Sequence, residues 1–368
     1  MPFERPYVSL IINGVNYTKE ALLNADYEKR LVVRATDKTW LRSLHNFLIA
    51  WIDENEFVTV STSGSTGTPK QIELSKERMM QSAFMTGKYF DFKSGQTALL
   101  CLPCDYIAGK MMVVRAIMWG LDLQLVPPSG NPMVNIEQLI HFGAMVPLQV
   151  VAIFEQSPEK FKWLKQLIIG GGKVDASLQK KLQSIDCQCF ATYGMTETIT
   201  HVAIKKLNGY NQTDYFQGLD NIQFSVDERS CLVINAPQLS AEKVLTNDIV
   251  ELKNSQQFAW LGRFDNVINT GGVKVFPETI EEKLERLIMP RFFITSLPDQ
   301  RLENKVVLLI EDQKWSEAQL NQLRVAIDQV LTKFERPKQI FFLPKFAETP
   351  TNKIQRDRTK SQVKKFIL

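Results

Sequence analysis

Short apolar runs alternate with amphipathic stretches through most of this 368-residue chain. Such runs have the length of strands buried on both faces of a parallel sheet, and the stretches between them have helical periodicity. Alternation of this kind is typical of α/β layers. We expect strands at residues 57–60, 97–102, 121–126, 149–154 and 166–169. The predicted fold class is α/β, with a large multi-layer N-terminal domain of mixed β-sheets and helices.

Two helices are predicted early in the chain by the spacing of their apolar residues. Trp40, Leu44, Phe47 and Trp51 recur at three- or four-residue intervals, so residues 38–53 form a helix with one buried face. A second helix is expected over residues 75–89.

The pattern of predicted helices and strands changes near residue 263. We expect a helix around Ile280, Leu284 and Ile288, a strand at 305–310, a helix at 315–331 and a strand at 339–343. These elements predict a small α+β domain over residues 263–368, after a first domain of residues 1–262. The second domain has a net charge of +5 and the first of −1. A solvated basic face and a field that attracts phosphorylated ligands both fit this excess, whereas the absence of a nucleic-acid motif argues against nucleic-acid binding.

The composition and the N-terminal sequence bear on cellular location and on metal binding. No run reaches the ~20 apolar residues that a membrane span needs, and the N-terminus lacks a signal-peptide pattern, so we expect a cytoplasmic protein. Five cysteines, an odd number, fit reduced thiols. Cys101 and Cys104 with Cys187 and Cys189 could form a zinc site, but both pairs lie in strand-like runs where buried thiols are common. Three histidines are too few for a His-rich metal centre.

The strongest local signal is the decapeptide S-T-S-G-S-T-G-T-P-K, placed between a predicted strand and a predicted helix. Backbone N–H groups of such a loop can surround an anion, and hydroxyls add further donors. A flexible linker is the alternative, and the sequence does not match a Walker loop. The candidate phosphate-binding residues are Ser61, Thr62, Ser63, Gly64, Ser65, Thr66, Gly67 and Lys70.

This decapeptide resembles the phosphate-binding signature of the adenylate-forming superfamily, which includes acyl-CoA synthetases, luciferases and adenylation domains. Residues 191–198, A-T-Y-G-M-T-E-T, resemble the second core motif of that family. The resemblance implies that Tyr193 stacks on adenine, Thr196 meets the α-phosphate and Glu197 helps to hold Mg²⁺. Thr192 and Gly194 complete the ATP-binding motif.

Further matches follow in the order expected of the family. The resemblance implies that Asp248 binds the ribose hydroxyls and that the glycine turn lies along the adenine. It also implies an ATP-binding Arg263, a hinge at Asp265 and a catalytic lysine at Lys353. The glycine turn consists of Gly170, Gly171 and Gly172, and the face expected to admit CoA carries Gly271, Gly272 and Lys274.

The implied reaction has two steps, acyl-adenylate formation with release of pyrophosphate and then transfer to CoA. ATP, CoA and Mg²⁺ are the expected cofactors and substrates. A carboxylate is a poor electrophile, and adenylation supplies AMP as a leaving group. Charge accumulates on phosphate oxygens in that step, so Lys70, Thr196 and Lys353 are the expected catalytic residues. The resemblance further implies that residues 263–368 are a mobile lid that brings Lys353 in and later rotates.

The short region before the phosphate loop resembles the o-succinylbenzoate–CoA ligases of menaquinone biosynthesis. Their acid has two carboxylates, so the one that is not activated needs a cation or several donors. Candidates by position are Lys110, Arg115 and His201, with Tyr106 at the place where many relatives have a histidine. Each of the three could equally be a surface charge or a buried core residue.

Three alternatives stay open. The chain could be another aryl- or fatty-acid–CoA ligase, or a stand-alone adenylation domain that loads a carrier protein. A non-catalytic nucleotide-binding relative fits less well, because Lys70, Glu197, Asp248, Arg263 and Lys353 are all present. The expected partners are a small carboxylic acid, ATP and CoA, without nucleic acid or a membrane span; the sequence predicts no oligomeric state.

Overall fold

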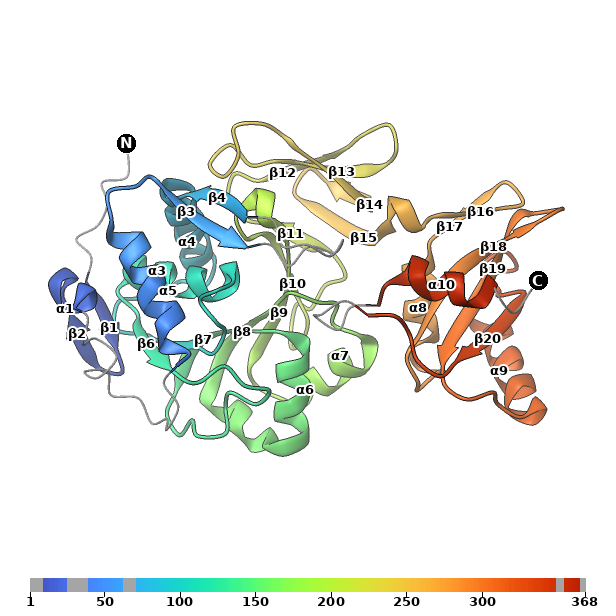
Figure 1. Ribbon diagram of the computed structural model, residues 1–368, viewed down its shortest axis with the longest axis horizontal. Coiled ribbons are helices and arrows are strands. Elements are labelled where there is room, and N and C mark those ends of the chain that lie inside the picture. The colour runs from blue at the N-terminus through green and yellow to red at the C-terminus, as the bar shows by residue number, and fades with distance from the viewer. Residues whose placement is uncertain (1–8, 25–38, 62–70, 349–353, 365–368) are drawn as a thin grey trace.

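A computed structural model describes residues 9–24, 39–61, 71–348 and 354–364 (Figure 1). The structure is a mixed α/β fold with a large sheet, a smaller sheet and a two-stranded hairpin. Figure 1 shows the small sheet and its helices gathered at one end, at the right of the view, away from the N-terminal elements.

The large sheet has thirteen strands in the described part of the chain. Its central strands β6, β5, β7, β8 and β9 pair in parallel, and antiparallel pairing resumes from β9 to β10 onward. From one edge to the other the strands are β12 (Gln223–Val226), β13 (Cys231–Asn235), β14 (Val244–Asn254), β15 (Gln257–Arg263), β11 (Phe216–Gly218), β10 (His201–Lys206), β9 (Gln188–Gly194), β8 (Leu164–Ile169), β7 (Ile140–Met145), β5 (Thr97–Leu100), β6 (Asp122–Leu125), β1 (Leu10–Ile12) and β2 (Val15–Tyr17).

Helices cover both faces of the parallel strands. Successive strand residues point to opposite faces, so Ile168 joins one hydrophobic core and Ile169 the other. The first core packs against α3 (Leu41–Ile52), α4 (Lys76–Tyr89) and α5 (Ile107–Trp119); the second packs against α6 (Pro147–Gln156), η1 (Pro158–Trp163) and α7 (Ala176–Leu182). The short α1 (Lys19–Leu23) contributes Leu22 to the first core. Burial on both faces explains why these strands read as continuous apolar runs.

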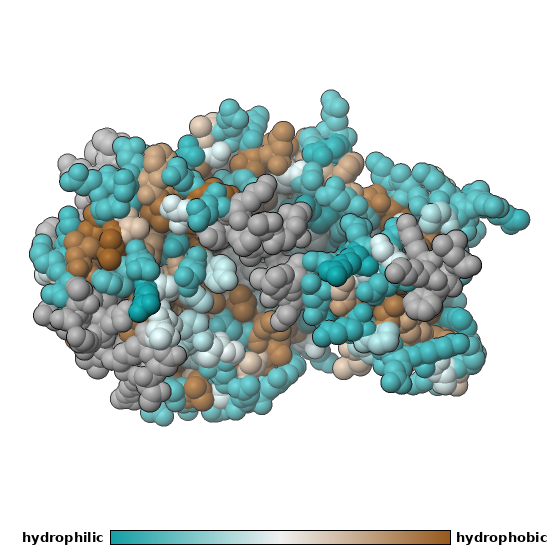
Figure 2. Space-filling view, in the orientation of Figure 1, coloured by the Kyte–Doolittle hydropathy of each residue, from teal (hydrophilic) through white to brown (hydrophobic). Residues whose placement is uncertain are grey.

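The second sheet belongs to the C-terminal part of the chain, which has its own core. Its strands are β16 (Ile268–Thr270), β17 (Val273–Val275), β18 (Phe292–Asp299), β19 (Glu303–Glu311) and β20 (Gln339–Leu343). The helices are α8 (Pro277–Leu284), α9 (Glu317–Val330) and α10 (Arg356–Lys364). On the face shown in Figure 2, hydrophilic side chains cover most of this part.

Most expected elements are confirmed, including the helix at 38–53, observed as α3, and the four C-terminal elements. Two predictions are wrong. Residues 149–154 lie in helix α6, which begins with Pro147 at a helix start, and the strand is β7 just before it. The decapeptide does not run from strand to helix: β3 (Phe57–Ser61) pairs antiparallel with β4 (Gln71–Ser75), which precedes α4. Ile72 and Leu74 on one side of β4 pack inward, a period of two that favours a strand.

All five cysteines are free and buried, as expected. Burial raises the pKa of Cys101 and of Cys104 to about 12. Within the described residues, no helix is both long enough and apolar enough to cross a membrane.

Phe142 on β7 offers a test of the large core. The side chain is 1% exposed and contacts the rings of Phe90 and Phe92, at centroid distances of 5.1 and 4.7 Å. We expect Phe142→Ala to lower the free energy of unfolding by about 3–5 kcal/mol, because it leaves a cavity between these rings. Denaturant titration measures the loss. Val325→Ala on the exposed face of α9 is the control and should change stability little.

Candidate active site

The glycine turn lies where two parallel strands end side by side. Ile169, the last residue of β8, pairs with Ala191 on β9, so Gly170–Gly172 and the end of β9 share one edge of the sheet. A Cβ added at Gly170 would lie 2.6 Å from Oγ1 of Thr192, and Gly171 has φ of +76°. Glycine fits both positions without displacing the Thr192 side chain or straining the backbone, and it leaves open backbone at the carboxyl edge, where α/β sheets bind ligands.

Tyr193 lies at the end of β9 against an aromatic wall. Its ring centroid is 5.0 Å from that of Phe258 and 5.8 Å from that of Phe216. Its hydroxyl donates to Oδ2 of Asp248 at 2.6 Å. Burial, together with the Asp248 charge, raises the pKa of Tyr193, so the phenol stays protonated and remains a donor. The structure therefore brings together the two residues expected to meet adenine and ribose.

The chain turns sharply after β9. A Cβ at Gly194 would lie 2.1 Å from the carbonyl oxygen of Thr200, so this approach of two strands requires glycine. The 3₁₀ turn η2 (Thr196–Thr198) follows, with Glu197 exposed. Ile199 then adopts φ of +66°, which is strained for a β-branched residue. Strain beside Thr196 and Glu197 fits a segment held for binding rather than for stability.

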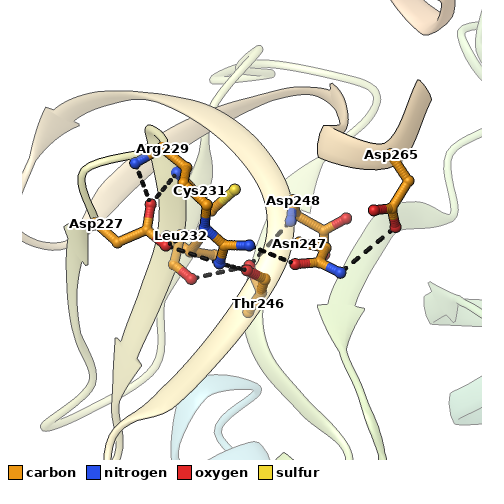
Figure 3. A network of polar contacts seen from close by, with 8 residues as sticks. All are labelled: Asp227, Arg229, Cys231, Leu232, Thr246, Asn247, Asp248 and Asp265. Carbon is orange, nitrogen blue, oxygen red and sulfur yellow. Dashed lines mark hydrogen bonds and ion pairs between the residues drawn. The ribbon is translucent and has the colours of Figure 1, made fainter. Parts of the chain in front are cut away.

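Asp248 sits on a β-bulge of β14 (Figure 3). The pairing with β13 shifts register between Cys231 and Val233, which leaves Thr246, Asn247 and Asp248 opposite a single residue. The Thr246 hydroxyl restores the lost bonds: it donates to the Leu232 carbonyl at 2.8 Å and accepts from the Asp248 N–H at 3.1 Å. A bulge redirects side chains, and here it accompanies a buried carboxylate next to Tyr193.

Arg263 connects Asp248 to the segment expected to be a hinge. Its Nε lies 3.6 Å from Oδ1 of Asp248, and its Nη2 lies 3.8 Å from Oδ2 of Asp265. Asp265 is the middle residue of the short turn η3 (Phe264–Asn266), which lies between the last strand of the large sheet and the first of the small sheet in the chain. Gly271 and Gly272 form the β16–β17 turn with positive φ, and Lys274 is exposed on β17.

A buried polar cluster lies between α4, α5 and β10, formed by Ser82, Thr86, Arg115, Thr200 and His201. Arg115 is 2% exposed, and its Nε has no hydrogen-bond partner. No ion pair involves this guanidinium in the described part of the chain. Burial lowers the pKa of Arg115 to about 10, so the side chain remains a cation at neutral pH.

The hydrogen bonds of Thr86 determine which ring nitrogen of His201 carries the proton. Thr86 Oγ1 donates its single hydrogen to the Ser82 carbonyl at 2.9 Å, so it must accept from Nε2 of His201 at 3.2 Å. Nδ1 is then the unprotonated nitrogen. Burial, with Arg115 as a second cause, lowers the pKa of His201 well below its usual value. The ring is therefore neutral at pH 7.

Lys110 and Tyr106 differ from Arg115 in their surroundings. The Lys110 ammonium donates to the Cys104 carbonyl at 2.6 Å and lies 5.0 Å from the centre of the Phe47 ring. Burial lowers its pKa. Tyr106 precedes α5 and is 48% exposed. Lys110 thus has partners within the protein, which leaves Arg115 as the better candidate for an acidic ligand.

Several predicted site residues lie outside the described residues: Thr62, Ser63, Gly64, Ser65, Thr66, Gly67, Lys70 and Lys353. Ser61 ends β3. The roles expected of them stay predictions.

Sequence reasoning missed three polar residues near the site. Ser82 and Thr86 read as ordinary helix positions, yet both are buried and polar. Their four-residue spacing on α4 is the signal, because it aligns two hydroxyls on the inward face. Arg229 follows β12 in a turn and gave no signal. Its importance lies in contacts with residues far along the chain.

Comparison with known proteins identifies the class. A family model described as "AMP-binding enzyme" matches residues 12–220, more than half of the chain. The chain therefore belongs to the family of AMP-binding enzymes.

Individual relatives narrow the likeness. The chain is 35% identical to a crystal structure described as an acyl-CoA synthetase (AMP-forming)/AMP-acid ligase II-like protein from Dyadobacter fermentans, with a TM-score of 0.61 and coverage of 92% of this chain and 97% of that one. It is 23% identical to the 2-succinylbenzoate–CoA ligase of Haemophilus influenzae over 78% of this chain, and spans 66% of that enzyme's length. A Bacillus subtilis o-succinylbenzoate CoA synthetase, solved with its acyl-adenylate, shares the fold at 17% identity, with a TM-score of 0.68 over 82% of this chain and 68% of that one.

The neutral His201 predicts a dependence of stability on pH. In the unfolded chain a histidine takes up a proton as the pH falls through about 6.5, whereas folded His201 does not. The unfolded state thus binds more protons, and the free energy of unfolding falls by up to about 1.4 kcal/mol per pH unit below that point. We expect His201→Asn to show a shallower loss of stability between pH 6.5 and 5. Equal slopes for the two proteins, measured by denaturant titration, would contradict a buried neutral His201.

Proposed function

We propose that this chain is an ATP-dependent carboxylic acid–CoA ligase that forms an acyl-adenylate and then an acyl-CoA. Its membership of the AMP-binding family supports the first step. Likeness to CoA ligases, including the Haemophilus influenzae enzyme, supports the second. ATP, Mg²⁺ and CoA are the proposed cofactors and substrates.

The described residues fit a nucleotide. The Gly170–Gly172 turn exposes backbone that a flat base can approach, and the Tyr193 ring ends the neighbouring strand. The Asp248 carboxylate accepts the Tyr193 hydroxyl at Oδ2 and lies 3.6 Å from Arg263 Nε at Oδ1. Each oxygen has further acceptor capacity, so it can also accept ribose hydroxyls. Thr192, Gly194 and Arg263 complete this proposed site.

The proposed chemistry stabilises charge on phosphate oxygens. Ser61 to Gly67 would supply donors to the phosphates, and Lys70 would offset the charge of the leaving pyrophosphate. Thr196 would donate to the α-phosphate, and Lys353 would bridge it to the attacking carboxylate. Glu197, which is exposed, would hold Mg²⁺, and the metal would neutralise phosphate charge when bound.

We propose a domain boundary at residue 263, with residues 263–368 acting as a mobile lid. The change from one sheet to the other at this point supports it, as does the separate core of the C-terminal part. Rotation about Asp265 would move Lys353 away from the nucleotide site. It would bring in the face expected to admit the CoA thiol, which carries Gly271, Gly272 and Lys274.

The acid is proposed to carry a second carboxylate, as o-succinylbenzoate does. The single observation behind this is Arg115, a buried guanidinium whose Nε has no partner in the described part of the chain. A buried charge without a counter-ion is costly, so such a residue fits a site whose counter-ion is the ligand. o-Succinylbenzoate would place this enzyme in menaquinone biosynthesis.

We also propose a cytoplasmic location. The five free, buried cysteines support it, because thiols persist in a reducing compartment.

A panel of acids tests the proposed function. We expect ATP-dependent pyrophosphate release with o-succinylbenzoate, and little with benzoate or with medium-chain fatty acids. With CoA present, a thioester should form. Preference for a fatty acid would overturn the substrate, and turnover only with a carrier-protein thiol would overturn CoA as acceptor.

Arg115→Met tests the role of the buried cation. We expect the variant to lose about 10–100-fold in kcat/KM for the diacid, the range that corresponds to a charge-assisted hydrogen bond. Stability of the ligand-free protein should stay unchanged or rise, because an unpaired buried charge is removed. Arg115→Lys, which keeps the charge, is the matched control and should retain more activity. A large loss of stability in Arg115→Met would instead make Arg115 a structural residue.

Lys353→Ala separates the two half-reactions. We expect the variant to lose adenylate formation while it still forms thioester from supplied acyl-adenylate, since the lysine acts only on the first transition state. Each half-reaction is followed separately, by pyrophosphate release and by thioester absorbance. Equal loss of both would contradict this division.

A further inference from the structure

Arg229 contacts three separate segments of the chain. It lies in the tight turn between β12 and β13, where its Nε donates to Oδ2 of Asp227 at 2.8 Å. That carboxylate also accepts the backbone N–H groups of Arg229 and Cys231, at 2.8 and 2.9 Å. These hydrogen bonds within the turn therefore orient the Arg229 guanidinium (Figure 3).

The guanidinium reaches the bulge of β14. Nη2 donates to the Thr246 carbonyl at 3.2 Å, and Nη1 donates to Oδ1 of Asn247 at 3.0 Å. Both acceptors belong to the residues that the register shift leaves without regular pairing. Arg229 thus holds the backbone just before Asp248.

The same group reaches the segment between the two sheets. Its central carbon lies 5.2 Å from the centre of the Phe264 ring, a cation–π contact. Asn247, held by Arg229 at its oxygen, donates from Nδ2 to Oδ2 of Asp265 at 3.4 Å. Two successive residues of η3 are therefore held from one arginine, directly and through one amide.

We propose that Arg229 is a positioning residue for the interdomain segment, holding Phe264 and Asp265 in the orientation of this structure. The inference rests on the proposed function only in treating Asp265 as a hinge. A planar guanidinium that forms forked hydrogen bonds and stacks on a ring can make all these contacts at once, whereas a lysine cannot. Its side chain is 41% exposed, so the contacts restrain a surface segment rather than fill a core.

Limited trypsin digestion tests the inference at a natural cleavage site, the Arg263–Phe264 bond. Cleavage requires local opening of this segment, so its rate reports how firmly Phe264 is held. We expect Arg229→Gln to raise the rate at this bond by about threefold or more, the change that lost exposed polar contacts produce in an opening equilibrium. Arg229→Lys should give a smaller rise, since it keeps the charge.

Further variants separate a local hold from general loosening. Phe264→Leu should raise the same rate, and the double variant should show less than the product of the two effects, because both changes remove one contact. Arg324→Gln on the exposed face of α9 is the matched control and should leave the rate unchanged. Mass spectrometry of the fragments assigns each cleavage, and thermal unfolding measures global stability.

Two outcomes would overturn the inference: an unchanged rate at Arg263–Phe264 in Arg229→Gln, or a rise shared by all cleavage sites with a lower Tm. The digestion needs no substrate. If the protein activated no acid, the proposed function would be wrong, but the digestion would still show whether Arg229 holds this segment.

Discussion

The pairing of β9 with two neighbours of opposite direction determines where the residues of the candidate site lie. β9 runs parallel to β8 and antiparallel to β10, so the sheet changes character along this strand. The glycine turn after β8 and Tyr193 at the end of β9 meet at the same edge as a result. The antiparallel strands beyond β10 then bring Asp248 back to Tyr193 from 55 residues further along the chain.

The buried cluster around Arg115 obeys a different constraint. Neutral polar groups there satisfy one another, as Thr86 does with Ser82 and His201. The Arg115 Nε has no such partner within the described residues, and folding bears the cost of desolvating its charge. If Arg115 binds the second carboxylate of the acid as proposed, this position lowers the stability of the ligand-free protein in favour of binding, as is common at binding sites.

Periodicity predicted the helices and most strands, because an element that packs one face against the core repeats its apolar residues at its own spacing. The buried residues of α3, for example, recur at helical spacing. It failed at residues 149–154, where five apolar residues follow Gln149 and suit a strand and a helix equally, and the proline before them favoured the helix. Motifs located Tyr193 and Asp248 as candidates but not their hydrogen bond, which depends on the bulge of β14. Arg229 escaped prediction because each of its contacts is set by tertiary structure.

Arg263 lies close to both Asp248 and Asp265, at 3.6 and 3.8 Å, and this sharing has a thermodynamic consequence. A ligand that forms hydrogen bonds to the Asp248 carboxylate would weaken the attraction between Asp248 and Arg263, and so change the electrostatic interaction between Arg263 and Asp265. Linkage is reciprocal: the factor by which ligand binding shifts the orientation of the Phe264–Asn266 turn equals the factor by which that orientation changes ligand affinity. One guanidinium near two carboxylates can therefore couple a ligand contact at Asp248 to the orientation of the turn at Phe264–Asn266.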